Sequence, residues 1–461
     1  MKRVAIVGAG IAGLSLAHAL RKRSGGRGID VVVLEASARA GGNIRSERQD
    51  GYLIEWGPNG FLDSAPMTLA LVGELGLVEE LHVSSDRARR RFLFRNGRLH
   101  EMPAGPAAFV RSRLLSPGGK LRLALEPFAQ ARPEGDETIH AFAARRIGRE
   151  AADVLIDSMV SGVFGGDARE LSLRSCFPKM WQMETDHGGL FRALFASLRA
   201  RRLRKGDAVG APLGRLTSFR GGTEELVRGL VRSLGGIVRT ATAVASVEQK
   251  ANGFTLAIGD GVTITADAVA MCGGARASAA LVGPVDEDLA AQLGSIPAAP
   301  LCIVCLGYSL EKLPSPPDGF GFLVPRGEGP RILGVLWDSS IYEGRAPAEK
   351  VLLRAMIGGA CDPDAVRLEE RELVDIVRRD LASTMGITIA PEMVRIIRHP
   401  DGIPQYTVGH AARLSGIESA LRGHPGLFVG GNSYRGVAIN ACIEDAEALA
   451  DRVLAAVRPA P

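Results

Sequence analysis

The chain has 461 residues, of which 46% are hydrophobic, 23% charged and 5% aromatic, and its formal net charge is +5. A chain of this length needs roughly two or three domains, and its apolar content is that of a well-filled globular protein. No run of about 18 apolar residues occurs, so a transmembrane helix is not expected. The basic clusters 87–98 and 199–205 lack interleaved aromatic residues, which argues against nucleic acid as a partner.

The N-terminus carries a dinucleotide-binding fingerprint. A β-branched run ends in Gly8-Ala9-Gly10-Ile11-Ala12-Gly13, and an apolar stretch with helical spacing follows. In such a strand–turn–helix unit the glycines allow a tight turn, close approach of a pyrophosphate, and close packing of helix on strand. The next predicted strand, 31–34, ends in Glu35, whose carboxylate can bind both ribose hydroxyls and disfavours NADP.

Two further glycine segments accompany the fingerprint. Gly41, Gly42 and Arg45 follow Glu35, and near the C-terminus a predicted strand at 426–429 leads into Gly430, Gly431 and Asn432. The segment 436–440 then opens a predicted helix that runs to about Val457. These segments resemble motifs of the flavoprotein superfamily of amine oxidases, protoporphyrinogen oxidases and phytoene desaturases. That resemblance implies that the double glycine passes near the FAD pyrophosphate, and that the last helix points its N-terminus at the flavin.

The middle of the chain alternates between helical and strand-like patterns. Apolar residues recur at helical spacing over 141–160, and helical spacing prevails over most of 92–205. A glycine turn at 219–226 precedes a helix to about Leu234. Alternating patterns predict strands at 243–247, 254–258 and 262–265, and a strand at 269–272 returns to the nucleotide sheet. A second strand-rich region covers 297–400.

The six cysteines indicate a reducing compartment. Cys302 and Cys305 have CxxC spacing inside an apolar run, but a strand would place their thiols on opposite faces, which predicts core cysteines rather than a redox pair. The histidines form no metal-binding pattern, so no metal site is expected.

The whole chain resembles the protoporphyrinogen oxidase family. The motifs that carry this resemblance are at 55–61, 114–122, 162–167, 171–178, 319–325 and 333–336. It implies an α/β fold, α+β overall, with a p-hydroxybenzoate hydroxylase-like FAD-binding Rossmann domain, a mixed-sheet substrate domain and a helical membrane-binding domain. The expected boundaries are 1–91, 206–296 and 401–461 for the FAD-binding domain, 92–205 for the helical domain and 297–400 for the substrate domain.

The resemblance also implies site residues. Contact with one non-covalent FAD is expected from Gly8, Ala9, Gly10, Ile11, Ala12, Gly13, Glu35, Ala36, Gly42, Arg45, Gly57, Pro58, Asn59, Val247, Gly431, Gly436, Val437, Ala438 and Ile439. Contact with the tetrapyrrole is expected from Arg95, Asn59, Gly162, Phe320, Leu323, Leu336 and Met356. Some family members have arginine where Asn59 stands, so a charge at that position is not general to the chemistry.

Arg95 is the expected partner of a substrate propionate. It lies in a predicted hairpin, 92–98, whose turn at Asn96-Gly97 would present its side chain. Arginine can hold a carboxylate with two parallel hydrogen bonds. Arg98 is the alternative in the same hairpin.

The resemblance predicts oxygen-dependent oxidation of protoporphyrinogen IX to protoporphyrin IX in three two-electron steps, by hydride transfer to FAD and release of hydrogen peroxide. No strong base is required, because hydride loss from a methylene bridge gives a cation that the pyrrole nitrogen stabilises. The alternatives are coproporphyrinogen III, which has four propionates and needs more cations, a flavin amine oxidase, and a protein that uses FAD only structurally.

The expected partners are the porphyrinogen, O2 and membrane lipid. The apolar helices of 92–205 and the basic run 199–205 favour peripheral contact with the inner face of the cell membrane, and hence a cytoplasmic protein. A homodimer and hand-over of product to a ferrochelatase are further expectations from the resemblance.

Overall fold

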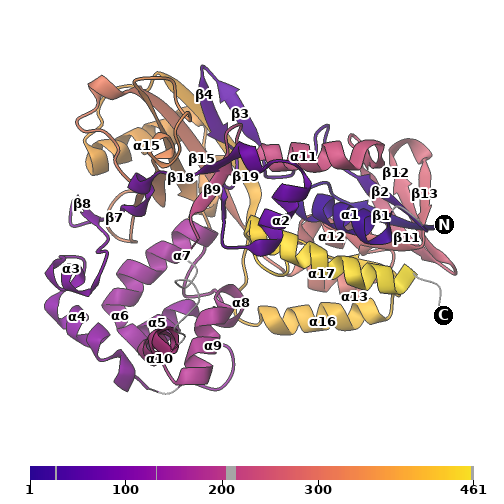
Figure 1. Cartoon of the computed structure of the whole chain (residues 1–461), viewed down its shortest axis with the longest axis horizontal. Helices are drawn as coiled ribbons and strands as arrows, with labels where there is room; N and C mark the ends of the chain where they lie inside the picture. The colour runs from indigo at the N-terminus through magenta and orange to yellow at the C-terminus, as the bar shows by residue number, and fades with distance from the viewer. Residues whose placement is uncertain (26–27, 131, 204–213, 458–461) are drawn as a thin grey trace.

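The computed structural model describes residues 1–25, 28–130, 132–203 and 214–457. Figure 1 shows a mixed α/β architecture, in which a nucleotide-binding half, a large mixed sheet and a group of helices lie next to one another. Among the described residues no helix is long and apolar enough to cross a membrane.

A parallel five-stranded sheet forms the centre of the first half. Its strands, in spatial order, are β10 (Val238–Arg239), β2 (Ile29–Leu34), β1 (Lys2–Val7), β14 (Ala268–Met271) and β20 (Leu427–Val429). Strands buried on both faces read as continuous apolar runs, as residues 4–7 of β1, 31–34 of β2 and 268–271 of β14 do. Helices α1 (Ile11–Ser24), α11 (Glu224–Leu234) and α17 (Ile439–Val457) pack on one face. The predicted return of the chain to this sheet is therefore confirmed.

The other face of this sheet is covered by a small antiparallel sheet and three helices. These elements are β11 (Val244–Lys250), β12 (Gly253–Ile258), β13 (Thr263–Ala266), α12 (Ala275–Val282), α13 (Glu287–Gly294) and α16 (His410–Arg422). The three strands lie where alternation predicted them, because one face of each packs on the core and the other meets solvent.

A seven-stranded mixed sheet forms the second half. Its spatial order is β19 (Met393–Pro404), β15 (Ala298–Ser309), β18 (Lys350–Gly358), β17 (Gly334–Leu336), β16 (Gly321–Leu323), β7 (Arg91–Arg95) and β8 (Arg98–Glu101). Helix α15 (Glu370–Met385) covers one face of this sheet, and the side chain of Cys302 packs on that face. Cys305 packs on the other face, against β4 (Tyr52–Glu55). The prediction of two core cysteines on opposite faces is confirmed.

The hairpin β7–β8 turns through Asn96 and Gly97, which both have positive φ, as predicted. β7 pairs in parallel with β16, so the hairpin lies in the large sheet and not among the helices that follow it. This differs from the expected boundary at residue 92, because strand pairing with a segment more than two hundred residues away leaves no local signal.

Residues 106–203 form the helical group at the lower left of Figure 1. Its helices are α3 (Pro106–Arg111), α4 (Pro117–Ala124), α5 (Ile139–Ile147), α6 (Arg149–Ala151), α7 (Asp157–Phe164), α8 (Leu173–Cys176), α9 (Pro178–His187) and α10 (Leu190–Leu203). The helical spacing predicted over 141–160 is confirmed, although the helix is interrupted once. Gly148, with φ +96°, ends α5, and a π-helical segment, Ala152–Ile156, precedes α7.

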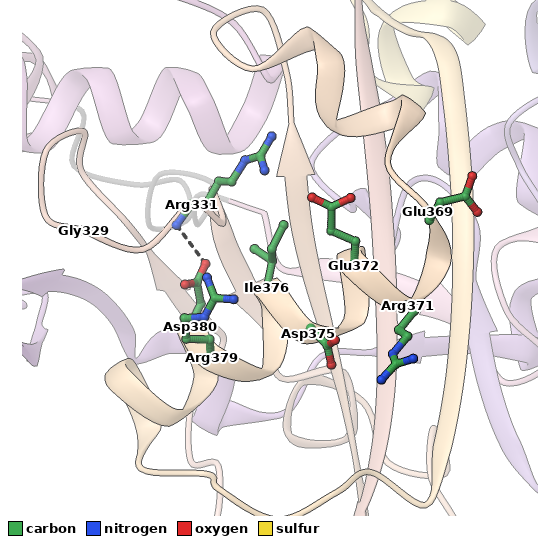
Figure 2. Close-up of a pocket in the computed structure, with 9 residues that line it drawn as sticks. All are labelled: Gly329, Arg331, Glu369, Arg371, Glu372, Asp375, Ile376, Arg379 and Asp380. Atoms are coloured by element: carbon green, nitrogen blue, oxygen red, sulfur yellow. Dashed lines mark hydrogen bonds between the residues drawn. The ribbon is translucent and has the colours of Figure 1, made fainter.

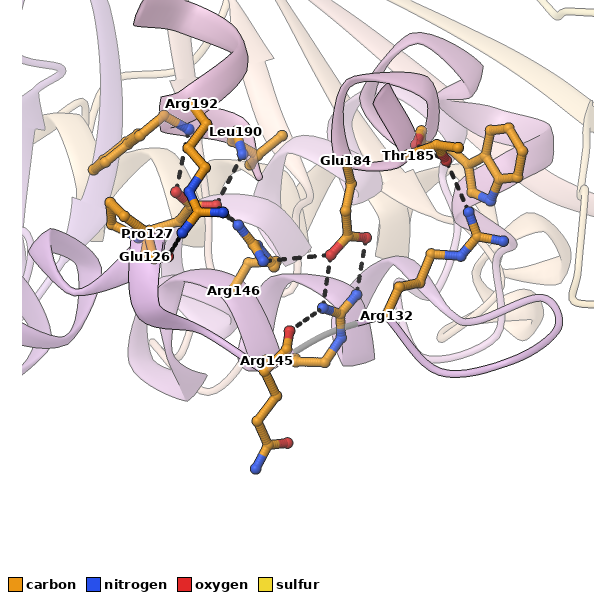
Figure 3. A network of polar contacts seen from close by, with 12 residues as sticks. Glu126, Pro127, Arg132, Arg145, Arg146, Glu184, Thr185, Leu190 and Arg192 are labelled. Carbon is orange, nitrogen blue, oxygen red and sulfur yellow. Dashed lines mark hydrogen bonds and ion pairs between the residues drawn. The ribbon is translucent and has the colours of Figure 1, made fainter. Parts of the chain in front are cut away.

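A buried ion-pair network ties these helices together (Figure 3). The fully buried carboxylate of Glu126 accepts from Nε of Arg146 at 2.8 Å and from the main-chain N–H of Leu190 at 2.9 Å, so it caps the N-terminus of α10. Arg145 bridges Glu184 and Glu137 at 2.7 and 2.6 Å. Removing one partner would leave a buried charge unpaired.

The remaining elements join the two halves. They are β3 (Ser46–Gln49), β5 (Phe61–Leu62), β6 (Leu81–Val83), β9 (Leu216–Phe219), α2 (Pro66–Glu74) and α14 (Asp338–Ile341). β3 pairs with β4, and β9 lies between β5 and β6.

Candidate active site

The glycine turn after β1 has the geometry that a dinucleotide requires. Gly8 has φ +104°, and a Cβ on Gly13 would lie 2.0 Å from the carbonyl oxygen of Gly8. A Cβ on Gly10, by contrast, would meet no heavy atom within 4 Å. Two glycines are therefore needed by the protein itself, and the third leaves open space at the N-terminus of α1, where a pyrophosphate fits.

Glu35 lies at the end of β2, directly beside this turn. Its Oε2 accepts from the main-chain N–H of Ala9 at 2.8 Å, and its Oε1 accepts from Ser37 at 2.9 Å. A carboxylate has about four acceptor positions, so lone pairs remain for ribose hydroxyls. Ala36 follows in the same loop.

The double glycine packs against the first glycine segment. Gly41 donates its N–H to the carbonyl oxygen of Ala9 at 2.7 Å, and a Cβ on Gly42 would be 3.4 Å from Cα of Gly10. Arg39 holds this loop through the carbonyl oxygens of residues 40, 42 and 44. Arg45 stacks on the indole of Trp56, with its guanidinium carbon 3.8 Å from the ring centroid.

The C-terminal glycine segment reaches the same place. Gly431, with φ +106°, would bring a Cβ to 3.4 Å from Cβ of Ala12. Gly436 donates its N–H to the hydroxyl of Tyr406 at 2.8 Å, and that hydroxyl donates to the carbonyl oxygen of Asn432. Burial raises the pKa of Tyr406, which keeps this hydroxyl a donor. The loop before α17 is therefore fixed, and it leads through Val437 and Ala438 into Ile439.

The three glycine segments converge, and the residues present fit an FAD. Val247 is fully buried on the edge strand β11, where it lies opposite Leu256 of β12. Gly57 approaches the double-glycine loop so closely that a Cβ would lie 2.4 Å from the carbonyl oxygen of Asn43, which brings Pro58 and Asn59 next to the loop.

The expected substrate residues share one face of the large sheet. In the strand register Leu323 and Met356 both lie opposite Gly334, and Leu336 lies opposite Gly321, so all three side chains point to the same side. They are half-buried, whereas their neighbours on the other face are buried against α15. This alternation indicates that the three side chains line a space.

Helix α7 closes in on this face. A Cβ on Gly162 would lie 2.5 Å from Cδ2 of Leu323, so glycine is required for the approach of the helix. Phe320 lies just before β16 and packs with Leu336 and Tyr342. The expected residues Gly162, Phe320, Leu323 and Leu336 are therefore brought together.

A buried charged cluster supports the segment that carries Asn59. Glu55 accepts from Arg345 at 2.6 Å, and Arg354 donates to the carbonyl oxygens of Glu55 and Gly57 at 3.2 and 2.9 Å. Nε of Arg354 lies 3.1 Å from Oδ2 of Asp338, whose Oδ1 accepts from the amide of Asn59 at 3.1 Å. Burial raises the pKa of Asp338, and the two guanidinium groups oppose that rise.

The guanidinium of Arg95 already has partners within the protein. Its guanidinium donates to the carbonyl oxygen of Leu114 and to Glu150 at 3.0 Å, and it lies 4.0 Å from Glu328. Arg91 lies four residues earlier on the same face of β7. Its guanidinium carbon lies 4.9 Å from the centroid of Phe320. Among the described residues no carboxylate pairs with Arg91.

A separate hollow of about 630 Å³ lies at α15 (Figure 2). It is lined by Gly329, Arg331, Glu369, Arg371, Glu372, Asp375, Ile376, Arg379 and Asp380. Asp380 accepts from the main-chain N–H groups of Arg331 and Ile332, and Arg331 pairs with Asp362 at 2.7 Å. This hollow belongs to the α15 side of the sheet and contains none of the glycine segments.

Sequence reasoning missed Arg91, Asp338, Arg354 and Tyr406. One signal was present: Arg354 stands alone inside the apolar strand 351–357, and a charge in a buried strand requires a buried partner. Nothing in the sequence marks Asp338 as that partner, because it lies in a separate segment, at the start of α14.

The converging glycine segments, next to a sheet face lined by apolar side chains, define a flavin-dependent oxidoreductase. The family model for flavin containing amine oxidoreductase matches residues 11–454, and the chain belongs to this family. It is an oxidase with FAD as its cofactor.

Within this family, the chain is similar to porphyrinogen oxidases. The chain is 34% identical to the protoporphyrinogen oxidase of Homo sapiens, covering 98% of each protein, and 31% identical to the coproporphyrinogen III oxidase of Bacillus subtilis (strain 168), covering 97% of each. A crystal structure from Exiguobacterium sp. 255-15, assigned as a protoporphyrinogen oxidase, superposes with a TM-score of 0.85 at 26% identity, over 98% of each chain. The predicted resemblance is confirmed.

Proposed function

We propose that this protein oxidises protoporphyrinogen IX to protoporphyrin IX with O2 as the electron acceptor. The observation that carries the proposal is the apolar face of Leu323, Leu336 and Met356, with Gly162 opposite it, next to the converging glycine segments. A largely apolar tetrapyrrole matches such a face. The human relative is named for this activity.

Bound FAD supplies the two-electron acceptor, and the chain supplies position and electrostatics. Leu323, Leu336 and Met356 exclude water from the macrocycle and orient a methylene bridge. Asn59 stands between the two halves, where its amide can contact the reacting ring. Gly57 and Gly436 are needed by the protein itself, since a Cβ would lie 2.4 Å from the carbonyl oxygen of Asn43 and 2.5 Å from Cβ of Ala441. No side chain needs to act as a base.

Arg91 is the propionate anchor in this proposal, in place of Arg95. Its guanidinium lies beside Phe320 and has no carboxylate partner among the described residues, whereas Arg95 is paired with Glu150. A charged hydrogen bond to a propionate is worth about 1.5–3 kcal/mol. A bidentate contact from Arg91 would fix the orientation of the macrocycle on the sheet.

Coproporphyrinogen III is the second candidate, because bacterial relatives carry that name. It has four propionates and needs more cations. Five arginines lie in register on this face. Arg95 is paired with Glu150, Arg354 with Asp338 and Arg395 with Glu47, which leaves Arg91 and Arg98 without a carboxylate partner among the described residues. This balance favours the substrate with two propionates.

Peripheral membrane contact through the helical group is also part of the proposal. Phe128, Val110 and Leu121 are 83%, 69% and 63% exposed, and Phe195 on α10 is 66% exposed. Exposed apolar side chains on neighbouring helices can enter a lipid surface. The basic run 199–205 was expected to assist, but residues 204 and 205 lie outside the described residues. Dimerisation and product hand-over to a ferrochelatase stay predictions.

Aerobic turnover tests the main proposal. Protoporphyrinogen IX should give porphyrin fluorescence and hydrogen peroxide, in a ratio of about three peroxides per porphyrin, as three two-electron oxidations require. A parallel assay with coproporphyrinogen III should be slower at equal concentration. Formation of porphyrin only from coproporphyrinogen III would reassign the substrate, and peroxide from amines alone would indicate an amine oxidase.

A further inference from the structure

The amide of Asn59 is held in one orientation by a carboxylate. Asn59 is 8% exposed, and its Nδ2 donates to Oδ1 of Asp338 at 3.1 Å. An ionised carboxylate can only accept hydrogen bonds, so the NH2 end of the amide must face Asp338. The oxygen end, Oδ1, is buried and has no hydrogen-bond partner among the described residues.

Arg354 fixes this orientation of the Asn59 amide through Asp338. Its Nε lies 3.1 Å from the other oxygen of Asp338, and its Nη1 donates to the carbonyl oxygens of Glu55 and Gly57. A guanidinium has no acceptor and remains charged, which favours the ionised form of Asp338. The same arginine thus holds both the carboxylate that orients Asn59 and the main chain that carries Asn59.

A buried acceptor without a partner is costly unless a ligand completes it. The proposed substrate has four pyrrole N–H groups, and positive charge develops on a pyrrole as the methylene C–H bond breaks and its electron pair leaves with hydrogen to the oxidised cofactor. An acceptor fixed beside that nitrogen would stabilise the charge as it forms, without reorganisation.

We propose that Asp338, held by Arg354, is a positioning residue that turns the oxygen of Asn59 toward the ligand, so that Asn59 accepts a hydrogen bond from an N–H group of the bound tetrapyrrole. This inference rests on the proposed function. An N–H group of the flavin is the other source of the same chemistry, and the two sources are separated below.

Asp338→Asn tests the orientation itself. Arg354 can only donate, so the new amide at 338 must turn its oxygen toward Arg354 and its NH2 toward Asn59. Asn59 then has to turn its own oxygen toward residue 338 and present NH2 to the ligand, where two donors face each other. The substitution therefore reverses the hydrogen-bonding character of Asn59 while it keeps size and shape.

The experiment measures the rate of flavin reduction by protoporphyrinogen IX without O2, in single turnovers of the FAD-loaded protein, together with FAD affinity, substrate affinity and unfolding temperature. We expect Asp338→Asn to slow reduction roughly tenfold or more, the size of one lost hydrogen bond in the transition state. Asn59→Ala should slow it similarly, and Asp338→Asn added to Asn59→Ala should cause no further loss.

Asp380→Asn is the matched control. Asp380 is another buried carboxylate of the same half, and it accepts two main-chain hydrogen bonds on the α15 side, away from the site. This substitution should lower the unfolding temperature and leave the rate of flavin reduction unchanged. A structural effect of Asp338→Asn alone would resemble this control.

Four results would overturn the inference. An unchanged reduction rate in Asp338→Asn shows that the orientation has no role, and additive losses in the double variant show that the two residues act independently. Weaker FAD binding with an unchanged reduction rate assigns the N–H donor to the flavin. Failure of the unsubstituted protein to react with any porphyrinogen removes the proposed function, and the inference falls with it.

Discussion

The cofactor half and the substrate half of this molecule are built from different kinds of contact. In the cofactor half, glycines and main-chain hydrogen bonds form the site, as where Gly41 bonds to Ala9 and Gly13 packs on Gly8. In the substrate half, the site depends on strand register and on buried charges such as Arg354 and Asp338. A site formed by main chain tolerates little added volume, whereas the shape and charge of a site formed by side chains can be changed one residue at a time.

The largest effect is expected at Gly13. In Gly13→Ala the added Cβ would lie 2.0 Å from the carbonyl oxygen of Gly8, so the turn must move. Overpacking of this kind costs about 1–3 kcal/mol, and FAD affinity should fall up to about a hundredfold. FAD content and unfolding temperature of the purified protein are the measurements, and both should drop.

Gly10→Ala distinguishes an effect on FAD affinity from an effect on the stability of the fold. Nothing lies within 4 Å of the added Cβ, so the unfolding temperature of the FAD-free protein should stay the same. FAD affinity should still fall, because the Cβ fills the space for the pyrophosphate. Unaltered FAD affinity in Gly10→Ala would contradict the assignment of this space.

Arg91 and Arg95 give the next largest contrast. Arg91→Ala should raise KM roughly tenfold or more with a smaller change in kcat, since a charged hydrogen bond to the propionate is lost. Arg95→Ala removes the ion pair with Glu150 and should lower the free energy of unfolding by about 1–2 kcal/mol with little effect on KM. The reverse pattern would restore Arg95 as the anchor.

The sequence predicts the cofactor half well, because its signals are local. The glycine segments, Glu35 and the strands of the nucleotide sheet can each be identified from a few adjacent residues. The substrate half is different. Arg91 and Arg95 are equivalent by strand alternation, and only distant residues, Glu150 and Glu328, decide which guanidinium is occupied. The break at Gly148 was missed because apolar spacing continues through it.

The pH dependence of the rate should report Asp338. Burial raises its pKa, and the groups facing it are Arg354, Arg345, Glu55 and the neutral Tyr342. As pH falls through that raised pKa, the carboxyl gains an O–H that donates to Asn59 and turns its oxygen away from the ligand. The rate of flavin reduction should therefore decline on the acid side by roughly tenfold. Asp338→Asn should lack this decline, and its persistence there would assign it to another group.

The smallest effect on chemistry should come from the helical group. Phe128→Asp removes the most exposed aromatic side chain of the proposed lipid surface, and binding to anionic vesicles should weaken by about threefold to tenfold, a partial loss of the burial energy of one phenylalanine. Turnover in detergent should be unaltered. Val262→Asp, at an exposed apolar residue of the cofactor half, is the control. Equal flotation of both variants would argue against this surface.

Flavin bleaching in the absence of O2 tests the proposed function most directly. It requires FAD bound in the main-chain site and a porphyrinogen bound in the side-chain site at the same time. Protoporphyrinogen IX and coproporphyrinogen III are mixed in parallel with the yellow protein, and flavin absorbance is followed in time. We expect rapid bleaching by protoporphyrinogen IX and slower bleaching by coproporphyrinogen III. Faster bleaching by coproporphyrinogen III, or none by either, would contradict the proposed function.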